Sequence, residues 1–271
     1  MARDARELRG AWATFQSHWY GVPSADLAPF VSGYWAAEWD LRGQPPYRQK
    51  IVPYPHVHLT FRDGDAVVRG PERRYAVRVL EGRGRVFGVK FRPGCFRPFL
   101  GDRVSTITGR VLPAAAVFGP GRLPIPSPSA EGSFEEASQH SAGRVEEFLR
   151  QRLPAPDPLA ERAAGIVTLV RDEPGLTRVD ALAGRAGLGV RRLQRLFAEY
   201  VGLGPKWVIR RYRLHEVGER LAAGAEIDWA GLAGELGYAD QAHFVRDFTA
   251  MVGEPPTRYA ARYPGQGDGR H

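Results

Sequence analysis

The 271-residue sequence predicts an α+β multidomain protein, in which a β-sandwich or β-barrel precedes an all-α region. Short aromatic and β-branched runs, separated by Gly and Pro, follow one another between residues 11 and 118, a pattern typical of a sandwich or barrel. The chain after residue 133 shows helical periodicity instead. Within it, one short pattern occurs twice, about fifty residues apart, which indicates a duplicated helical unit.

The β-rich region is expected to contain strands wherever β-branched and aromatic residues alternate. Asp63–Asp65 and Gly82–Gly84 predict turns between such strands. The expected strands are residues 51–52, 57–61, 66–69, 75–80 and 85–91. Seven aromatic residues nearer the N-terminus either line an apolar pocket or fill the barrel and its covering segment: Trp12, Phe15, Trp19, Tyr20, Tyr34, Trp35 and Trp39.

The domain boundary is expected in the proline-rich run 153–158. Upstream of it, residues 119–133 are rich in Pro, Gly and Ser and predict a flexible loop, and residues 141–152 fit an amphipathic helix. The predicted division is a β-rich domain over 1–153, a helical domain over 159–263 and a disordered tail over 264–271.

The balance of charge favours an acidic partner such as nucleic acid, because the formal net charge is +8 and the sequence pI is 9.9. A local concentration is more informative than the total. Residues 185–213 include eight basic residues and only one acidic residue, Glu199, and a surface that binds phosphate requires such a concentration of positive charge. The eight are Arg185, Arg191, Arg192, Arg195, Lys206, Arg210, Arg211 and Arg213.

The single cysteine, Cys95, excludes an internal disulfide and a cysteine-based zinc cluster. Residues 1–10 lack the apolar core of a signal peptide. No apolar run approaches the roughly 20 residues that span a bilayer. We therefore expect a cytoplasmic protein in a reducing compartment, with no membrane partner.

The first copy of the repeated pattern predicts a helix-turn-helix unit. A helix is expected over about 178–185, a left-handed turn at Gly187, and a second helix over about 190–200. Leu193, Leu196, Phe197 and Tyr200 share the inward face of the second helix, which leaves four polar residues outside. Arginine and glutamine make paired hydrogen bonds to guanine and adenine edges, so these four are candidate DNA contacts: Arg191, Arg192, Gln194 and Arg195.

The second copy predicts a second unit, with a turn at Gly237 that is one residue longer than the first. Asp240 is a good N-cap and predicts a helix that begins at about Gln241. Phe244, Phe248 and Met251 form its buried face. The expected DNA-facing residues are Gln241, Ala242 and Arg246, with Val245 beside them and His243 nearby.

A connecting helix is expected from Pro205 to Ala223, and its length of roughly 26 Å is close to one DNA turn of about 34 Å. Two reading helices could then meet one face of a duplex. The alternative is a helical scaffold whose outward arginines serve solubility. Two copies in the same register, both with outward Arg and Gln, favour DNA binding.

Residues Arg178 to Tyr263 resemble the DNA-binding domain of AraC/XylS transcription regulators. The resemblance rests on LAGRAGLGVRRLQRLF, on LAGELGYADQAHFVRDF, on Gly204-Pro205 with Arg213-Leu214, and on GEPPTRY, and it covers about a third of the chain. It implies a sequence-specific DNA-binding transcription regulator. By position, base contacts fall on Arg191, Gln194 and Arg195, and then on Gln241, Ala242 and Arg246.

Two positions depart from this family's pattern. Gly189 stands where the family commonly has a capping serine, and glycine is a weaker N-cap. Ala242 has no side-chain hydrogen bond to offer a base, so the second unit is expected to read shape more than sequence.

The N-terminal stretch 82–101 resembles an uncharacterised sensor-like domain that is often fused to such regulators. This resemblance implies a cupin-like barrel that binds an effector, dimerises, or does both. Double-stranded DNA is the expected partner. RNA polymerase, an unidentified small-molecule effector and a second copy of the chain stay open as partners, and no cofactor is expected.

The alternative function is a DNA-tethered, cupin-like metal or reactive-cysteine enzyme of the alkylation-response type, although we expect no enzyme. His56 and His58 have the spacing of a cupin metal pair. A cupin metal site also requires a Glu a few residues on and a distant third histidine, whereas here Asp63 and Asp65 follow in a turn, so a role in lining or capping the barrel is favoured. Cys95 lies between two arginines, Arg92 and Arg97, which are expected to lower its pKa.

Overall fold

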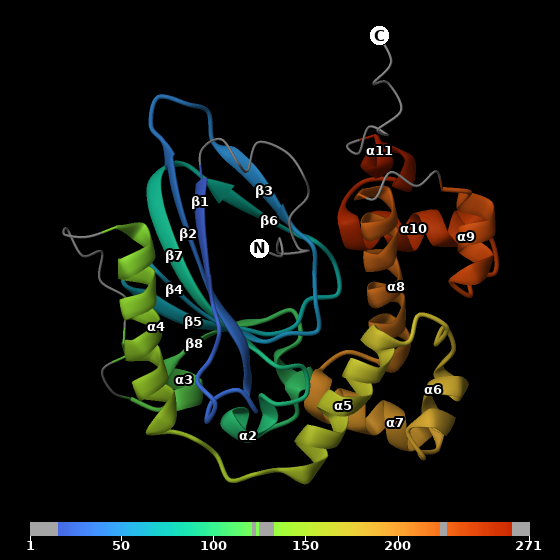
Figure 1. Cartoon of the computed structure of the whole chain (residues 1–271), viewed down its shortest axis with the longest axis horizontal. Coiled ribbons are helices and arrows are strands. Elements are labelled where there is room, and N and C mark those ends of the chain that lie inside the picture. Colours follow the sequence, from blue (N-terminus) through green and yellow to red (C-terminus); the bar gives the residue numbers. More distant parts are fainter. Residues whose placement is uncertain (1–15, 121–122, 125–132, 223–226, 262–271) are drawn as a thin grey trace.

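In this computed structural model, residues 16–120, 123–124, 133–222 and 227–261 are described. Trp12, Phe15, most of the predicted loop 119–133, Ala223 and the predicted tail 264–271 lie outside them. The α+β organisation is confirmed: strands come first and helices follow (Figure 1). Residues 151–157 connect the two regions, and the division into domains 1–153 and 159–263 is kept as a proposal.

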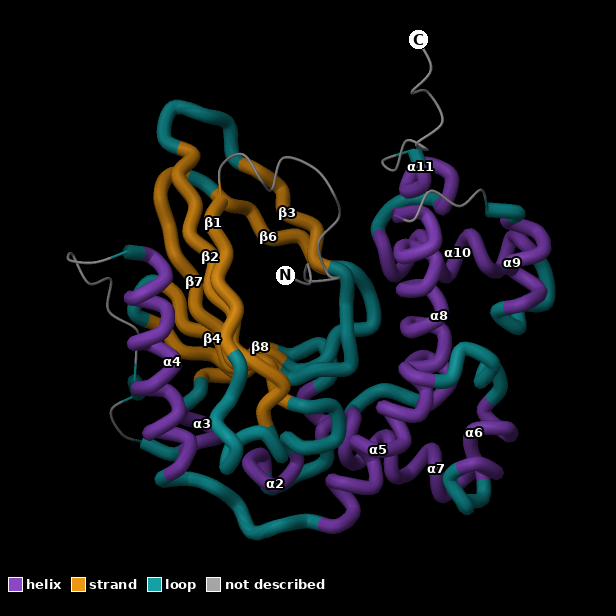
Figure 2. The backbone as a smooth tube through the Cα atoms, viewed as in Figure 1, coloured by secondary structure: helices purple, strands orange, loops and turns teal. Residues whose placement is uncertain are grey.

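The described strands form two separate antiparallel sheets and do not close into one barrel (Figure 2). The larger sheet has the order β1-β2-β7-β4-β5-β8, and the smaller is a β3–β6 ribbon. The bounds in the larger sheet are β1 (Gln16–Gly21), β2 (Val31–Leu41), β7 (Gly82–Phe91), β4 (His58–Arg62), β5 (Asp65–Arg69) and β8 (Val111–Pro113). The ribbon consists of β3 (Tyr47–Ile51) and β6 (Ala76–Leu80).

The predicted turn at Gly82–Gly84 is wrong, because these residues begin β7 and pair with Leu41–Trp39 of β2. Gly84 is required for this pairing: a Cβ there would lie 2.3 Å from Cζ2 of Trp39. Gly84 therefore accommodates the indole ring of Trp39 across the ladder. The turn at Asp63–Gly64 is confirmed, with φ values of 53° and 86°.

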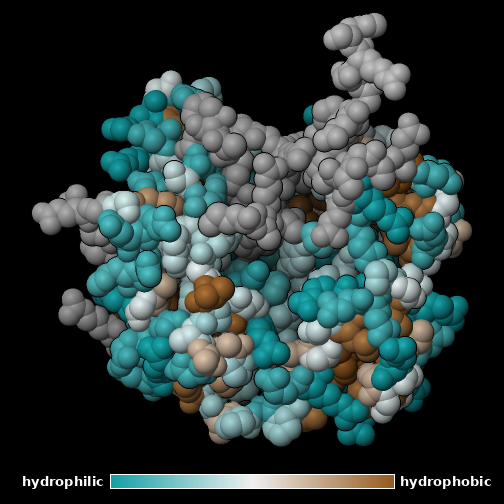
Figure 3. Space-filling model, viewed as in Figure 1, coloured by the Kyte–Doolittle hydropathy of each residue, from teal (hydrophilic) through white to brown (hydrophobic). Residues whose placement is uncertain are grey.

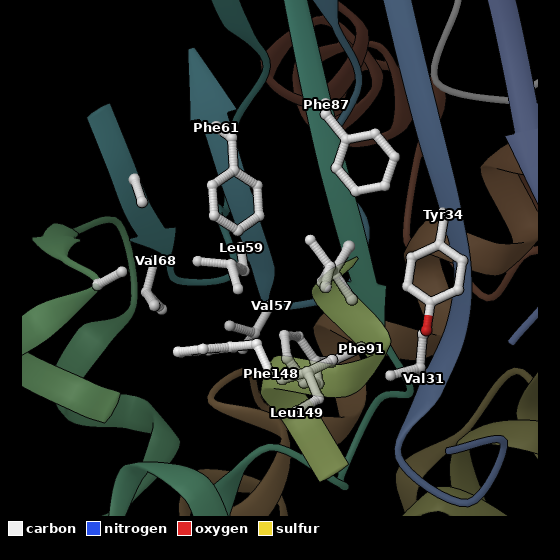
Figure 4. Close-up of a cluster of buried hydrophobic side chains, with 14 of the residues drawn as sticks. Val31, Tyr34, Val57, Leu59, Phe61, Val68, Phe87, Phe91, Phe148 and Leu149 are labelled. Atoms are coloured by element: carbon white, nitrogen blue, oxygen red, sulfur yellow. The ribbon is translucent and has the colours of Figure 1, made fainter. Parts of the chain in front are cut away.

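Alternation along β2 separates two sides of the larger sheet. Tyr34 and Ala36 belong to the main hydrophobic core, together with Phe148 and Leu149 of α4 (Phe134–Arg150) (Figure 4). Trp35 and Trp39 point to the opposite side and line a cavity. Among the described aromatic residues of this region, Trp19 and Tyr34 therefore belong to the core, whereas Trp35 and Trp39 line the cavity.

Helix α4 begins at Phe134, seven residues before the predicted start at 141. A reciprocal capping box explains the earlier start: Oγ of Ser133 accepts from the Glu136 amide, and the Glu136 carboxylate accepts from the Ser133 amide. Between β7 and α4, the described residues form three short helical segments that were not predicted. They are α2 (Arg97–Leu100), the 3-10 turn η1 (Val104–Ile107) and α3 (Ala115–Phe118).

The C-terminal region consists of helices packed around two hydrophobic clusters, and one long helix belongs to both. That helix is α8 (Pro205–Ala222), which contributes Val208 to the first cluster and Val217 to the second. The other elements are α5 (Pro158–Asp172), α6 (Val179–Arg185), α7 (Val190–Leu196), the π-helical turn η2 (Phe197–Val201), α9 (Trp229–Glu235), α10 (Gln241–Val252) and α11 (Pro256–Ala260).

Among the helices of the described residues, none is long and apolar enough to cross a membrane. The face in Figure 3 is mainly hydrophilic, and its larger hydrophobic areas lie over the helical half of the molecule.

Candidate nucleic-acid interface

The first helix-turn-helix unit consists of α6 and α7, joined by a glycine turn. Gly187 has φ 62°, and the Leu188 amide donates to the Ala183 carbonyl at 2.9 Å. The α7 side chain Leu193 is fully buried. Gly189 is the N-cap of α7 and contributes no side-chain hydrogen bond, as expected for glycine.

The second unit consists of α9 and α10 and repeats the same turn. Gly237 has φ 73°, and the Tyr238 amide donates to the Ala233 carbonyl at 2.9 Å, which matches the bond in the first unit fifty positions earlier. Oδ1 of Asp240 accepts from the His243 amide at 2.7 Å. The predicted cap and the predicted start at Gln241 are therefore confirmed, and so is the extra residue in the second turn.

The predicted DNA-facing residues lie mostly on the outside of α7 and α10. Val245 differs from the prediction, since it is half-buried against the second cluster. His243 is also half-buried, with its ring edge-on to Tyr238 and Nε2 3.9 Å from Asp247. The exposed residues are Arg191, Arg192, Gln194 and Arg195 on α7, and Gln241, Ala242 and Arg246 on α10.

The arginines on these outer faces differ from other arginines of the region in having no internal partner. Within the described parts of the chain, no hydrogen bond or ion pair holds Arg191, Arg192, Arg195 or Arg246. Arginines elsewhere in the units are paired: Arg178 with Asp180, Arg185 with Glu173, Arg210 with Asp247 and Arg220 with Glu235. The guanidinium donors of α7 and α10 therefore remain available to an outside acceptor.

The predicted concentration of positive charge between 185 and 213 is reduced by burial. Arg213 is fully buried; it donates to the Val170 carbonyl and its Nη1 lies 2.6 Å from Glu216. Arg211 is also buried, and its Nε donates to the Pro53 carbonyl. These two arginines connect parts of the protein and do not face phosphate, so the interpretation of all eight basic residues as one surface is wrong.

A shallow hollow of about 170 Å³ lies between α5 and α7. Arg192 and Arg195 line it together with Arg162 of α5, which the sequence analysis did not single out. Arg162 is exposed and donates to the Ala186 carbonyl at the turn of the first unit. The sequence could have indicated Arg162, because helical periodicity places it on the exposed face of α5 when Ala163 and Ala164 are buried.

Neither Cys95 nor the His56/His58 pair has the surroundings expected of a reactive thiol or a metal site. Cys95 is 1% exposed, and burial raises the pKa of its thiol to about 11, against the smaller lowering effect of Arg92. The expected lowering of this pKa is therefore wrong, because desolvation of the thiolate exceeds the attraction of the guanidinium. His56 lies before β4, with Nδ1 2.8 Å from the Phe91 carbonyl. The described residues contain no cluster of three His, Cys, Asp or Glu side chains that could hold a metal ion.

Buried Cys95 is expected to react slowly with iodoacetamide. At pH 8 the folded protein should be alkylated at least about tenfold more slowly than in urea, because the thiolate is the nucleophile and a pKa near 11 leaves little of it. Mass spectrometry over time measures both rates. Equal rates in the folded and unfolded protein would contradict this prediction.

Comparison with known families agrees with this geometry. Residues 182–262 match a family model described as a helix-turn-helix domain, and residues 21–113 match one described as a domain of unknown function, DUF6597. Residues 182–262 therefore form a DNA-binding domain of the helix-turn-helix class. This domain is of the AraC type, joined to an N-terminal domain of an uncharacterised family.

Solved structures with similarity to this chain include three regulators or regulator domains. An AraC-type regulator from Chromobacterium violaceum is 20% identical, over 40% of this chain and 96% of that chain, with a TM-score of 0.34. The DNA-binding domain of AdpA, solved with a target DNA, is 25% identical over 40% and 94%, with a TM-score of 0.31. ToxT from Vibrio cholerae is 10% identical over 93% and 100%, with a TM-score of 0.41. Similarities this low assign no ligand to this chain.

Proposed function

We propose that this protein is a sequence-specific transcription regulator that reads DNA with α7 and α10. The observation that carries the proposal is the set of exposed arginines on two equivalent helices that have no partner among the described residues. In α7 the base contacts are assigned to Arg191, Gln194 and Arg195, with Arg192 beside them. In α10 they are assigned to Gln241, Ala242 and Arg246, with His243 at the margin.

The connecting helix supports a bipartite site on DNA. Helix α8 has 18 residues, which corresponds to about 27 Å, and it is anchored in the hydrophobic clusters of both units. A rigid separation on this scale suits successive major grooves on one face of a duplex, about 34 Å apart. Since Ala242 contributes no side-chain donor, the first unit carries more of the direct base discrimination and the second more of the shape recognition.

Selection of bound duplexes from a random pool, with the purified full chain, tests this proposal. We expect one enriched motif with two half-sites about 10 base pairs apart. The variant Arg246→Ala should relax selection in one half-site and leave the other unchanged. Binding without any enriched motif would contradict sequence-specific recognition.

The N-terminal domain is proposed to sense a small molecule, because it contains a cavity of about 440 Å³ between its two sheets. This volume lies within the usual range of roughly 300–1,000 Å³ for small-molecule sites. A larger cleft of about 740 Å³ lies between the larger sheet and helices α5 and α8, and Tyr54 and His56 line both spaces. RNA polymerase and a second copy of the chain stay predicted partners.

A further inference from the structure

The cavity between the two sheets is mainly apolar, and each of its walls belongs to a different sheet. Trp35, Trp39 and Val67 line it from the larger sheet, and Ile51 and Leu80 line it from the β3–β6 ribbon. Because side chains alternate along a strand, β2 supplies the hydrophobic core on one side and this cavity on the other. An apolar molecule can therefore occupy the cavity without disturbing the core beneath α4.

One charged side chain of the cavity stands apart from the others. Arg62 pairs with Asp63 at 2.9 Å, Arg78 pairs with Glu72 at 3.3 Å, and Asp65 is exposed in the turn before β5. No such carboxylate pairs with Arg69 among the residues described, and its Nε donates to Oγ1 of Thr60 at 3.3 Å.

Half-burial of Arg69 makes an anion favourable beside it. Burial, and secondly the positive charge of Arg78, lower the pKa of the Arg69 guanidinium, and the negative charge of Glu72 offsets only part of this lowering. A negative group in the cavity would offset both effects, and a planar guanidinium can donate two parallel hydrogen bonds to it.

The buried amide oxygen of Gln49 adds a second requirement for a ligand of this cavity. Gln49 of β3 is 5% exposed and lines the cavity. Its Nε2 donates to the Lys50 carbonyl at 3.2 Å, whereas its Oε1 is buried and has no hydrogen-bond partner among the described residues. Since buried polar atoms are normally satisfied, a ligand N–H or hydroxyl near this oxygen would be favourable.

The ribbon that forms one wall of the cavity also holds the second reading unit. Nζ of Lys50 donates to the Gly253 carbonyl at 3.1 Å and lies 3.9 Å from Glu254. The Tyr75 amide donates to the Ala250 carbonyl at 3.3 Å. Val52, directly after β3, lines the cavity and also belongs to the hydrophobic cluster of the second unit.

The first unit is held by other elements. Oγ1 of Thr108, after η1, donates to the Gly202 carbonyl at 2.7 Å, and Arg97 of α2 pairs with Glu199 at 2.9 Å. The first unit therefore has contacts with the N-terminal region that do not involve the ribbon, in addition to the packing of Tyr54, three residues after β3, on the first cluster.

We propose that this cavity binds a small, largely apolar molecule that carries one acidic group, paired with Arg69, and a hydrogen-bond donor near Gln49. Binding of this molecule changes the position of the second reading unit through the β3–β6 ribbon. The binding site stands on the cavity by itself. The effect on DNA rests on the proposed function. Since coupling is reciprocal, DNA and the small molecule must alter each other's affinity by the same factor.

Two fluorescent probes that differ in one group test the binding site. Anilinonaphthalene sulfonate and the neutral N-phenyl-1-naphthylamine share an aromatic body and an N–H, and the first adds an acidic group. We expect Arg69→Met in the full chain to reduce the affinity for the sulfonate probe by about tenfold and to change the affinity for the neutral probe by no more than about twofold. Arg48→Met is the matched control, an exposed arginine on the ribbon, and should change neither.

A variant that fills the cavity tests whether both probes bind inside it. Ala37→Phe places a ring in the cavity from β2 and should exclude both probes, with folding checked by circular dichroism and melting. If Arg69→Met leaves the sulfonate probe unchanged or weakens both probes equally, the assignment of Arg69 is overturned. If both probes still bind the folded Ala37→Phe variant, the assignment of the cavity is overturned.

The coupling is tested by the affinity for a selected duplex, with and without the sulfonate probe. We expect a change of about fivefold or more in the natural chain. Lys50→Met should keep the affinity for the probe and reduce this change, because it removes one of the contacts between the ribbon and the second unit. An unchanged duplex affinity in the natural chain would overturn the coupling, whereas absence of specific DNA binding with intact probe binding would overturn the proposed function and leave the ligand site standing.

Discussion

Replacement of Phe244 by alanine is expected to destabilise the second reading unit by about 3–5 kcal/mol, the usual cost of deleting a fully buried phenylalanine. Phe244 is completely buried, and its ring centroid lies 5.4 Å from that of Tyr238 and 5.8 Å from that of Phe248. Its loss leaves a cavity under α10. We expect specific DNA binding to fall with the stability, because α10 loses its fixed position.

Urea unfolding followed by circular dichroism measures the change in the free energy of unfolding. Gln241→Ala is the matched control on the same helix, since Gln241 is exposed and its replacement should change stability by less than about 0.5 kcal/mol. A loss below about 1 kcal/mol for Phe244→Ala would show that the second unit does not depend on this cluster.

Replacement of Arg195 by alanine is expected to cost about 1–3 kcal/mol of specific DNA binding, the value of one good paired hydrogen bond to a base. Arg195 is exposed on α7, and no described residue holds its guanidinium. The loss should fall mainly on one base position. The Kd for the selected duplex and its single-base variants, at one salt concentration, measures this change.

Two further variants separate base reading from general attraction. Arg195→Lys should also lose discrimination, because an ammonium cannot make the paired hydrogen bonds of a guanidinium. Arg185→Ala is the control in the same unit, since Arg185 is already paired with Glu173 and should matter little. An equal loss on random DNA would show instead that Arg195 contacts phosphate, with a salt slope reduced by about one.

The helix-turn-helix units could be predicted in detail because their signals are local. The left-handed glycines Gly187 and Gly237, the cap at Asp240 and the helical spacing of Leu193, Leu196 and Phe197 act within one or two turns of chain. The start of α4 was also encoded locally, in the Ser133–Glu136 capping box, but the prediction overlooked that signal.

The strands were harder to predict because their partners lie far away in the sequence. β2 was missed, although it has 11 residues, since its place depends on pairing with β7 about fifty residues later. Gly82–Gly84 has the composition of a turn. That Gly84 leaves space for the Trp39 ring becomes evident only in the paired strands.

The identity and order of the residues by themselves determined the class of the protein: two glycine-hinged helix pairs on one connecting helix, with arginine and glutamine facing outward. Tertiary structure decided which arginines remain available. Arg211 and Arg213 are buried and donate to the carbonyls of Pro53 and Val170, whereas the arginines of α7 and α10 are exposed. The physical reason is range: a helical face follows from neighbours three or four residues away, whereas the partner of a charge is chosen by contacts across the whole fold.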